Sequence, residues 1–227
     1  MRVREIVLDT ETTGLDANGG DRIVEIGCVE LVDYIFTGNV FHHYINPERD
    51  IPYYSTKIHG ITVDMVKDKP KFADIADKFL DFISDGILVI HNAKFDISFI
   101  EMELSKINKE HRLNNSFVDT LILARKKFPG MPVTLDALCK RFNISLQDRK
   151  FHGALLDATL LSKVYIELKG GLQRSLNFSD MDKNNIEQRF TGSHNLCMRH
   201  FKINQYDYEK HKELLKKIKN SIWNKLK

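Results

Sequence analysis

The stretch from residue 3 to residue 14 constrains this chain more than any other part of its sequence. A short apolar run rich in β-branched residues predicts a buried strand: Val3, Ile6, Val7 and Leu8. The strand ends in Asp9 and Glu11, whose side chains point to the same side because they are two residues apart. Neighbouring carboxylates repel each other and lose hydration on burial, and Mg²⁺ or Mn²⁺ is the usual compensation. The alternative is a solvated strand end whose acids cap the following loop.

The size and composition indicate one folded domain with an extension. The chain has 227 residues, of which 42% are apolar and 29% are charged. No apolar run approaches the length of a membrane span and the N-terminus lacks an apolar signal core, so we expect a cytoplasmic location and no membrane association. Three scattered cysteines, Cys28, Cys139 and Cys197, argue against a disulfide framework or a cysteine-based zinc site.

The charge is unevenly distributed along the chain. Residues 171–227 contain 12 Lys and Arg and 6 Asp and Glu, which gives this segment a net charge of +6. The whole chain has a net charge of +3, so the first 170 residues have a net charge of −3. A nucleic-acid enzyme that holds metal ions is compatible with this distribution, because the metals supply local positive charge. Charge alone therefore neither establishes nor excludes a nucleic-acid substrate.

The order of the predicted elements indicates an α/β fold. Two further strands are predicted at residues 22–32 and 40–45, with a turn at 37–39 between them and a loop at 47–56 after them. Short strands at 87–90 and 117–119 then alternate with helices, which are predicted from residue 63 and over 72–83, 121–128, 135–142 and 154–168. The segment 91–96 opens a further predicted helix, which runs to about residue 107. We therefore expect a mixed five-stranded sheet flanked by helices, with sites at strand ends and helix starts.

The C-terminal part follows a different pattern. Residues 1–170 are expected to form the main domain, and residues 171–204, which show no sustained periodicity, are expected to be a flexible linker. Helical spacing returns in 205–227, where apolar residues share one side and lysines occupy the others. This basic amphipathic helix is either a docking segment for a partner protein or a solvated or domain-packed helix.

Acidic residues recur at two later junctions of this pattern. The segment from His91 to Asp96 follows the fourth predicted strand, and the segment from His152 to Asp157 opens the helix over 154–168. Together with Asp9 and Glu11 they make four acids in three separated segments. Such a set suits a two-metal site, in which ions about 3.5–4 Å apart stabilise the attacking and leaving oxygens of a phosphodiester.

The three segments resemble, in their order, the motifs of the DEDD family of 3′–5′ exonucleases, and the resemblance covers residues 1–170. The family has a His and a Tyr branch, and His152, five positions before Asp157, resembles the His branch, DEDDh. The greatest similarity is to proofreading exonucleases of bacterial replicases, over residues 6–14, 23–27, 59–61, 91–96, 124–130, 135–139 and 152–158. The resemblance implies a ribonuclease H-like sheet.

The resemblance also implies roles for the acids and the histidine. Two divalent ions, Mg²⁺ or Mn²⁺, are expected: Asp9, Glu11 and Asp157 would bind the inner one, Asp9 would bridge to the second, and Asp96 would hold the second, partly through water. His152 would be the catalytic general base that deprotonates the attacking water, which suits an imidazole whose ordinary pKa lies near neutrality. Attack on the last phosphodiester would release a nucleoside 5′-monophosphate.

Asp9, Glu11 and Asp157 are expected to contact the substrate, and further residues are expected to do so as well. Thr12, Thr13 and Gly14 resemble the turn that receives the 3′-terminal nucleotide, and His59 resembles a sugar and base contact of the family. Tyr54 stands where the family usually has an acidic contact, and a tyrosine there would stack or donate a hydrogen bond. Phe95 is either a base-stacking wedge or a core residue. His91 is expected to be a structural hydrogen-bond partner.

The tail resembles partner-binding segments in the same order. Residues 173–178 resemble the short peptides by which bacterial replication proteins bind the sliding clamp, with Gln173, Leu176 and Phe178 at the expected places; the alternative is a plain linker. The helix with Trp223 resembles the segment that holds the polymerase subunit, since a lone Trp is a credible interface residue. A small accessory subunit, known for some relatives, cannot be inferred.

These observations favour a 3′–5′ exodeoxyribonuclease that proofreads for a replicative polymerase and acts on single-stranded or mismatched DNA 3′ ends. The alternative enzyme is a stand-alone DEDDh exonuclease that trims RNA or short oligonucleotides, because the site motifs leave the choice between DNA and RNA open. A scaffold that uses only the fold is disfavoured by the complete set of acids with His152. A phosphatase is disfavoured because no phosphate-binding glycine-rich loop occurs.

Overall fold

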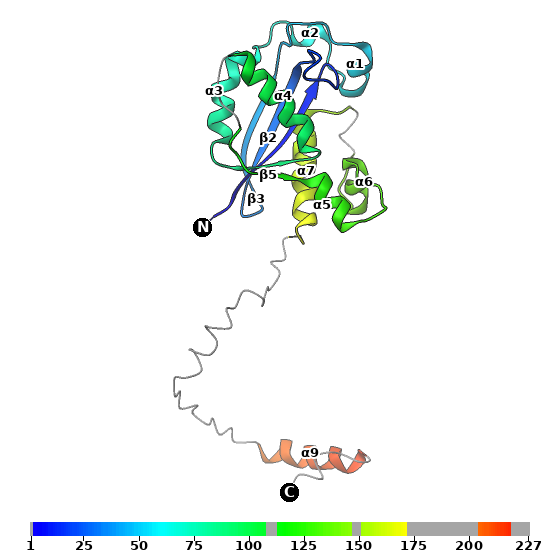
Figure 1. Cartoon of the computed structure of the whole chain (residues 1–227). Coiled ribbons are helices and arrows are strands. Elements are labelled where there is room, and N and C mark those ends of the chain that lie inside the picture. The colour runs from blue at the N-terminus through cyan, green and yellow to red at the C-terminus, as the bar shows by residue number, and fades with distance from the viewer. Residues whose placement is uncertain (1, 108–112, 147–150, 172–203, 219–227) are drawn as a thin grey trace. The chain divides into compact units, whose positions relative to one another are not determined.

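The computed structural model describes residues 2–107, 113–146, 151–171 and 204–218 (Figure 1). The chain divides into two units, residues 1–175 and 176–227, which are considered separately. The Gln173, Leu176, Phe178 and Trp223 positions lie outside the described residues. No helix in the described ranges combines the length and the apolar character that crossing a membrane requires.

The first unit is built on a mixed five-stranded sheet in the order β3-β2-β1-β4-β5. Its strands are β1 (Arg4–Thr12), β2 (Ile23–Val32), β3 (Ile35–Tyr44), β4 (Ile87–Ile90) and β5 (Phe117–Asp119). The first three strands pair antiparallel, whereas β4 runs parallel to β1 and β5 runs parallel to β4. The predicted α/β class and the mixed five-stranded sheet are therefore confirmed.

Helices cover both faces of this sheet (Figure 1). One face packs against α3 (Phe72–Ile83) and α4 (Ala93–Lys106) through Ile6 and Leu8 of β1. The other face packs against α7 (Ala154–Leu168) through Val7, and α5 (Thr120–Lys127) and α6 (Leu135–Arg141) pack on the far side of α7. Alternate residues of β1 thus reach opposite layers, as the pleat of a strand requires.

The turn between β2 and β3 differs from the predicted one. The chain reverses at Asp33 and Tyr34, which both have positive φ, 52° and 66°, as a two-residue hairpin turn requires. Residues 37–39, which were predicted to form the turn, instead form an irregularity inside the hairpin opposite Glu30. The prediction was wrong because Gly38, at φ 92°, marks a bulge here, and because Asp and Tyr carry a weaker turn signal than Gly.

A second difference lies in the segment predicted as a loop over 47–56. A helix, α1 (Tyr53–His59), begins directly after Pro52, and α2 (Val63–Val66) follows it. Only Ser55 and His59 of α1 are buried, so the apolar periodicity that reveals a helix in sequence is absent. Tertiary contact holds the helix instead, since the Ser55 hydroxyl donates to the Thr13 carbonyl at 2.8 Å.

Helix α7 rests directly on β2 at Gly27. A Cβ at this glycine would lie 2.3 Å from the backbone nitrogen of Leu155 and 2.4 Å from the carbonyl carbon of Ala154. Gly27 is the cross-strand neighbour of Asp9, so the first turn of α7 reaches the sheet beside the first acid of the sequence motif. The missing side chain is what permits this approach.

A buried carboxyl group holds the other end of α7. Glu5 of β1 is 2% exposed, and its Oε1 accepts a 2.6 Å hydrogen bond from the Tyr165 hydroxyl of α7. Its Oε2 has no hydrogen-bond partner among the described residues. Burial raises the pKa of Glu5 above 4.5, an effect that the Tyr165 hydrogen bond only partly opposes.

This burial predicts a pH dependence of stability that Glu5→Gln should remove. A carboxyl whose pKa is raised by folding contributes stability below its unfolded-state pKa, and the contribution is lost as pH rises through the folded-state pKa. The free energy of unfolding of the wild type should therefore fall relative to that of Glu5→Gln as pH rises above 4.5. Urea titrations of both proteins between mildly acidic and neutral pH measure this difference. Parallel pH profiles would contradict the assigned burial of the charge.

Candidate active site

Strand β1 delivers Asp9 and Glu11 to the α7 face of the sheet. Both residues alternate in phase with Val7, which packs against α7. Asp9 is partly buried and Glu11 is 9% exposed. Burying two acids at one strand end is costly unless compensating charge or hydrogen bonds are present, and a bound cation is one form of such compensation.

The N-terminal end of α7 brings Asp157 and His152 to the same place. Asp157 is 3% exposed, and its Oδ2 lies 3.3 Å from Nδ1 of His152, whose side chain is 49% exposed. One ligand atom each from Glu11, His152 and Asp157 lie within 4.8 Å of one another. The structure thus unites the first and third sequence segments, which are more than 140 positions apart in the chain.

Asp96 reaches the site from the opposite layer. Its Oδ1 accepts hydrogen bonds from the backbone nitrogen and the hydroxyl of Thr10, at 3.0 and 2.7 Å. Burial raises the pKa of Asp96 to about 7, against the lowering effect of the Thr10 hydrogen bonds. Burial also raises the pKa of the Cys28 thiol, and the charges of Asp9 and Asp96 raise it further. Thr10, which lies between Asp9 and Glu11 on β1, thus holds the Asp96 carboxyl at this strand end.

A pocket of about 170 Å³ opens beside the acids. The predicted substrate residues Glu11, Thr12, Gly14, Tyr54, His59 and Phe95 all line it, together with Thr10, Leu15, Ser55 and Ile58. Thr13 is fully buried behind this wall, and its carbonyl anchors Ser55. The ring of Phe95 lies 4.9 Å from that of Phe99, so Phe95 both lines the pocket and packs on α4.

His59 lines this pocket. The backbone nitrogen of Ile61 donates to its Nδ1 at 3.0 Å, which places the ring proton on Nε2 in the neutral form. Burial lowers the pKa of His59, and the Thr12 backbone opposes this shift. Nε2 is buried and has no hydrogen bond of normal geometry within the described residues. His59 is thus a mostly buried ring in the pocket wall, with 6% of its surface exposed.

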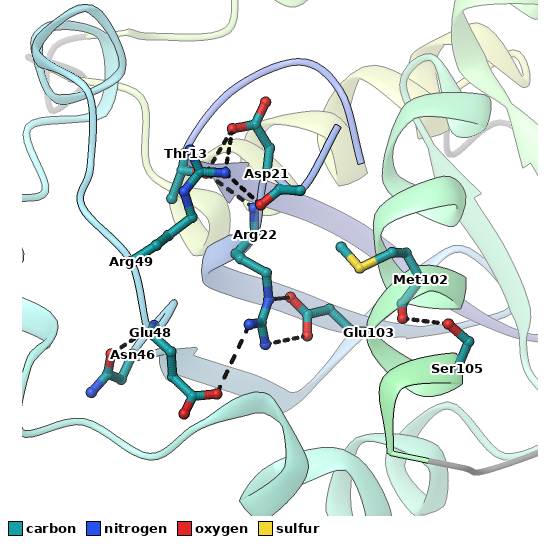
Figure 2. Close-up of polar contacts among 10 residues, drawn as sticks. Thr13, Asp21, Arg22, Asn46, Glu48, Arg49, Met102, Glu103 and Ser105 are labelled. Carbon is teal, nitrogen blue, oxygen red and sulfur yellow. Dashed lines mark hydrogen bonds and ion pairs between the residues drawn. The ribbon is translucent and has the colours of Figure 1, made fainter. Parts of the chain in front are cut away.

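Ion pairs fix the loop that forms one wall of the pocket (Figure 2). Arg22, where this loop enters β2, donates to both carboxylate oxygens of Glu103 on α4, at 2.6 and 2.8 Å. Asp21 accepts from the Thr13 hydroxyl and from Arg49, both at 3.0 Å. Glu103 is 1% exposed, so the Arg22 pair is a largely buried, bidentate link between the loop and the helix that carries Asp96.

Some residues that organise the site were missed in the sequence. Asp119 at the end of β5 accepts from the backbone nitrogens of Asn92 and Ala93 and so fixes the start of α4. Glu25 of β2 accepts from the backbone of α7. The sequence signals for Glu25 are its place as one of two acids in a mostly apolar strand and its position in the 23–27 stretch that resembles the family. His91 donates to or accepts from the Thr120 hydroxyl at 2.9 Å, in keeping with a structural role.

The donor set is suited to divalent cations. Carboxylate oxygens are the preferred protein ligands of Mg²⁺ and Mn²⁺, and Glu11 and Asp157 supply them at close range with His152 beside them. Asp9 and Asp96 add acids at the same strand end. The clustering of buried carboxylates that repel one another is the physical reason why a cation is favoured there.

Comparison with known proteins identifies the family. A family model described as an exonuclease matches residues 6–165. DNA polymerase III subunit epsilon of Rickettsia felis is 48% identical over 223 residues, which cover 95% of this chain and 97% of that protein. The protein of the same name from Buchnera aphidicola subsp. Acyrthosiphon pisum is 44% identical over 240 residues, covering 98% of this chain and 99% of that one.

Solved structures show the same architecture. Exonuclease X in complex with 5′ overhanging duplex DNA has a TM-score of 0.58 and 30% identity, covering 73% of this chain and 90% of that one. The nuclease domain of 3′hExo, a DEDDh family member bound to rAMP, has a TM-score of 0.61 and covers 73% and 91% of the two chains. At 16% identity this second likeness concerns the fold alone.

The ribonuclease H-like sheet and the carboxylate cluster at its edge define a nuclease of the exonuclease class. The chain belongs to this exonuclease family, among the epsilon subunits of DNA polymerase III. The predicted family and the predicted enzyme class, a 3′–5′ exonuclease, are thereby confirmed.

Proposed function

We propose that this chain is the proofreading subunit of a replicative DNA polymerase and removes nucleotides from single-stranded or mismatched DNA 3′ ends in the cytoplasm. The observation that carries the proposal is the meeting of Glu11, His152 and Asp157 beside a pocket, in a chain similar to epsilon subunits over nearly its whole length. A mismatched end would be favoured because an unpaired nucleotide costs less to unstack.

Two divalent cations, Mg²⁺ or Mn²⁺, are proposed at the acids. Asp9, Glu11 and Asp157 would hold one ion, Asp9 would be shared with the second, and Asp96 would hold the second, partly through water. Bound ions of this kind lower the pKa of water and neutralise charge that develops on a phosphodiester. Burial of Asp96 favours its neutral form, and a cation beside it would favour the ionised form that binds metal.

The remaining side chains of the site would transfer the proton and bind the terminal nucleotide. His152 would accept the proton of the attacking water, and Asp157, at 3.3 Å from its Nδ1, would stabilise the imidazolium that results. The half-exposed ring remains accessible to that water. His59 would contact the sugar or base of the terminal nucleotide, and Tyr54 and Phe95 would provide faces for base stacking.

Partner binding is proposed for the C-terminal segments beyond the 1–170 domain. Residues 173–178, within the 171–204 linker, would bind the sliding clamp through Gln173, Leu176 and Phe178. The 205–227 segment, with Trp223, would bind the alpha subunit of DNA polymerase III. Helix α9 (Gln205–Lys217) lies within this segment, which supports a helical docking element there.

A nuclease assay on the full-length chain tests the proposed function. The substrates are a 5′-labelled DNA primer with a mismatched 3′ end and an RNA of the same sequence, each with Mg²⁺, Mn²⁺ or EDTA. We expect stepwise shortening of the DNA from its 3′ end, lost in EDTA, with the RNA spared. Preferential shortening of the RNA would support the alternative of an RNA-trimming enzyme. No shortening of either substrate by protein that binds Mn²⁺ would contradict the proposal.

A further inference from the structure

Helix α7, which carries Asp157 and begins two residues after His152, has no side-chain cap of its own at its N-terminus. Its N-cap residue is Gly153, which has no side chain to accept from the first backbone nitrogens. Glu25 of β2 takes this role from across the sheet, because its Oε2 accepts from the Ala154 nitrogen at 3.0 Å. A carboxylate at a helix N-terminus also interacts favourably with the helix dipole.

Glu25 lies in an environment that would otherwise disfavour an acid. It is 3% exposed, and it faces Glu11 directly across the β1–β2 pair. Like charges opposite each other on a sheet are destabilising. Both carboxylate oxygens of Glu25 are nevertheless satisfied, one by Ala154 and the other by Nε2 of His42 at 2.7 Å.

We infer that Glu25 is a positioning residue, held by His42, that fixes the first turn of α7 so that Asp157 and His152 meet Glu11. The inference rests on the proposed exonuclease activity. Gly27, two residues further along β2, lets the same turn of α7 approach the sheet, and Glu25 then anchors it. Strand β2 therefore positions Asp157 and His152, although neither residue belongs to this strand.

A matched control is available on the same face of the sheet. Glu5 is equally buried at 2% and also contacts α7, but through Tyr165 near the C-terminal end of the helix. Loss of either carboxylate removes a buried hydrogen bond to α7. Only the loss of Glu25 releases the end that bears Asp157 and His152.

The test compares full-length Glu25→Ala, Glu25→Gln and Glu5→Ala at a temperature where all are folded. In Glu25→Ala we expect faster hydrogen exchange at the Ala154 amide, about 10-fold weaker Mn²⁺ binding by electron paramagnetic resonance, and kcat lowered by about 10–100-fold, a usual range for residues that orient metal ligands. KM should change little, because the pocket residues are untouched. Glu25→Gln keeps an acceptor and should restore exchange protection and most of kcat, and Glu5→Ala should retain wild-type kcat.

Three results would overturn the inference. These are unchanged Ala154 exchange in Glu25→Ala, a loss of kcat in Glu5→Ala as large as in Glu25→Ala, and a Gln variant as defective as the Ala variant. If the wild type shows no nuclease activity, the proposed function fails, whereas amide exchange and Mn²⁺ affinity still decide the role of Glu25.

Discussion

Asp157→Asn is expected to lower kcat by about 10³-fold, since metal-assisted charge stabilisation contributes several kcal/mol and each 1.36 kcal/mol is about tenfold in rate. Asp157 is 3% exposed on the first turn of α7, its Oδ2 lies 3.3 Å from His152, and it clusters with Glu11. Asn has the same shape but lacks the charge, so the fold should persist while cation binding and imidazolium stabilisation are lost.

Single-turnover cleavage of a labelled oligonucleotide, with Mn²⁺ titrations alongside, measures this effect. Glu167→Gln is the matched control, because it removes one charge from the same helix at an exposed position outside the cluster. The control should cleave at the wild-type rate. If Asp157→Asn retained activity within tenfold of the wild type, the two-metal mechanism would be wrong for this chain.

Gly27→Ala adds a single methyl group and should strongly destabilise the fold. The added methyl carbon would lie 2.3, 2.4 and 2.5 Å from backbone atoms of Ala154 and Leu155, which cannot move aside as a side chain can. Helix α7 would have to lift from β2, and overpacking of this kind costs about 1–3 kcal/mol or more. We therefore expect the free energy of unfolding to fall by about 3 kcal/mol. The exonuclease activity per folded molecule should fall as well.

Urea unfolding and cleavage rates of the folded fraction separate these two effects. Gly153→Ala is the control for stability: its φ is −152°, and the added carbon would meet only Glu25 Oε2 at 3.8 Å. Its unfolding free energy should remain within about 0.5 kcal/mol of the wild type. Equal stability and activity of Gly27→Ala and the wild type would contradict the close packing of α7 on β2.

The sequence predicted the elements whose residues carry their own signal. The apolar run before Asp9 predicts β1, the helical spacing of apolar residues predicts α3, and the two glycines after Leu168 mark the end of α7. Helix α1 and the turn at Asp33 and Tyr34 were not predicted, because each is stabilised by contacts or backbone angles that leave no apolar periodicity or glycine signal.

Chemistry and family were determined by the sequence itself, because carboxylates and a histidine at fixed spacings restrict both the ligand and the reaction. The motif acids Asp9, Glu11, Asp96 and Asp157 were found in this way. Only the tertiary structure decided what holds these groups together: the cap that Glu25 provides for α7, the close approach at Gly27 and the Arg22–Glu103 ion pair. Those contacts join residues far apart in the chain, and burial gives them their strength, so no local pattern of residues reveals them.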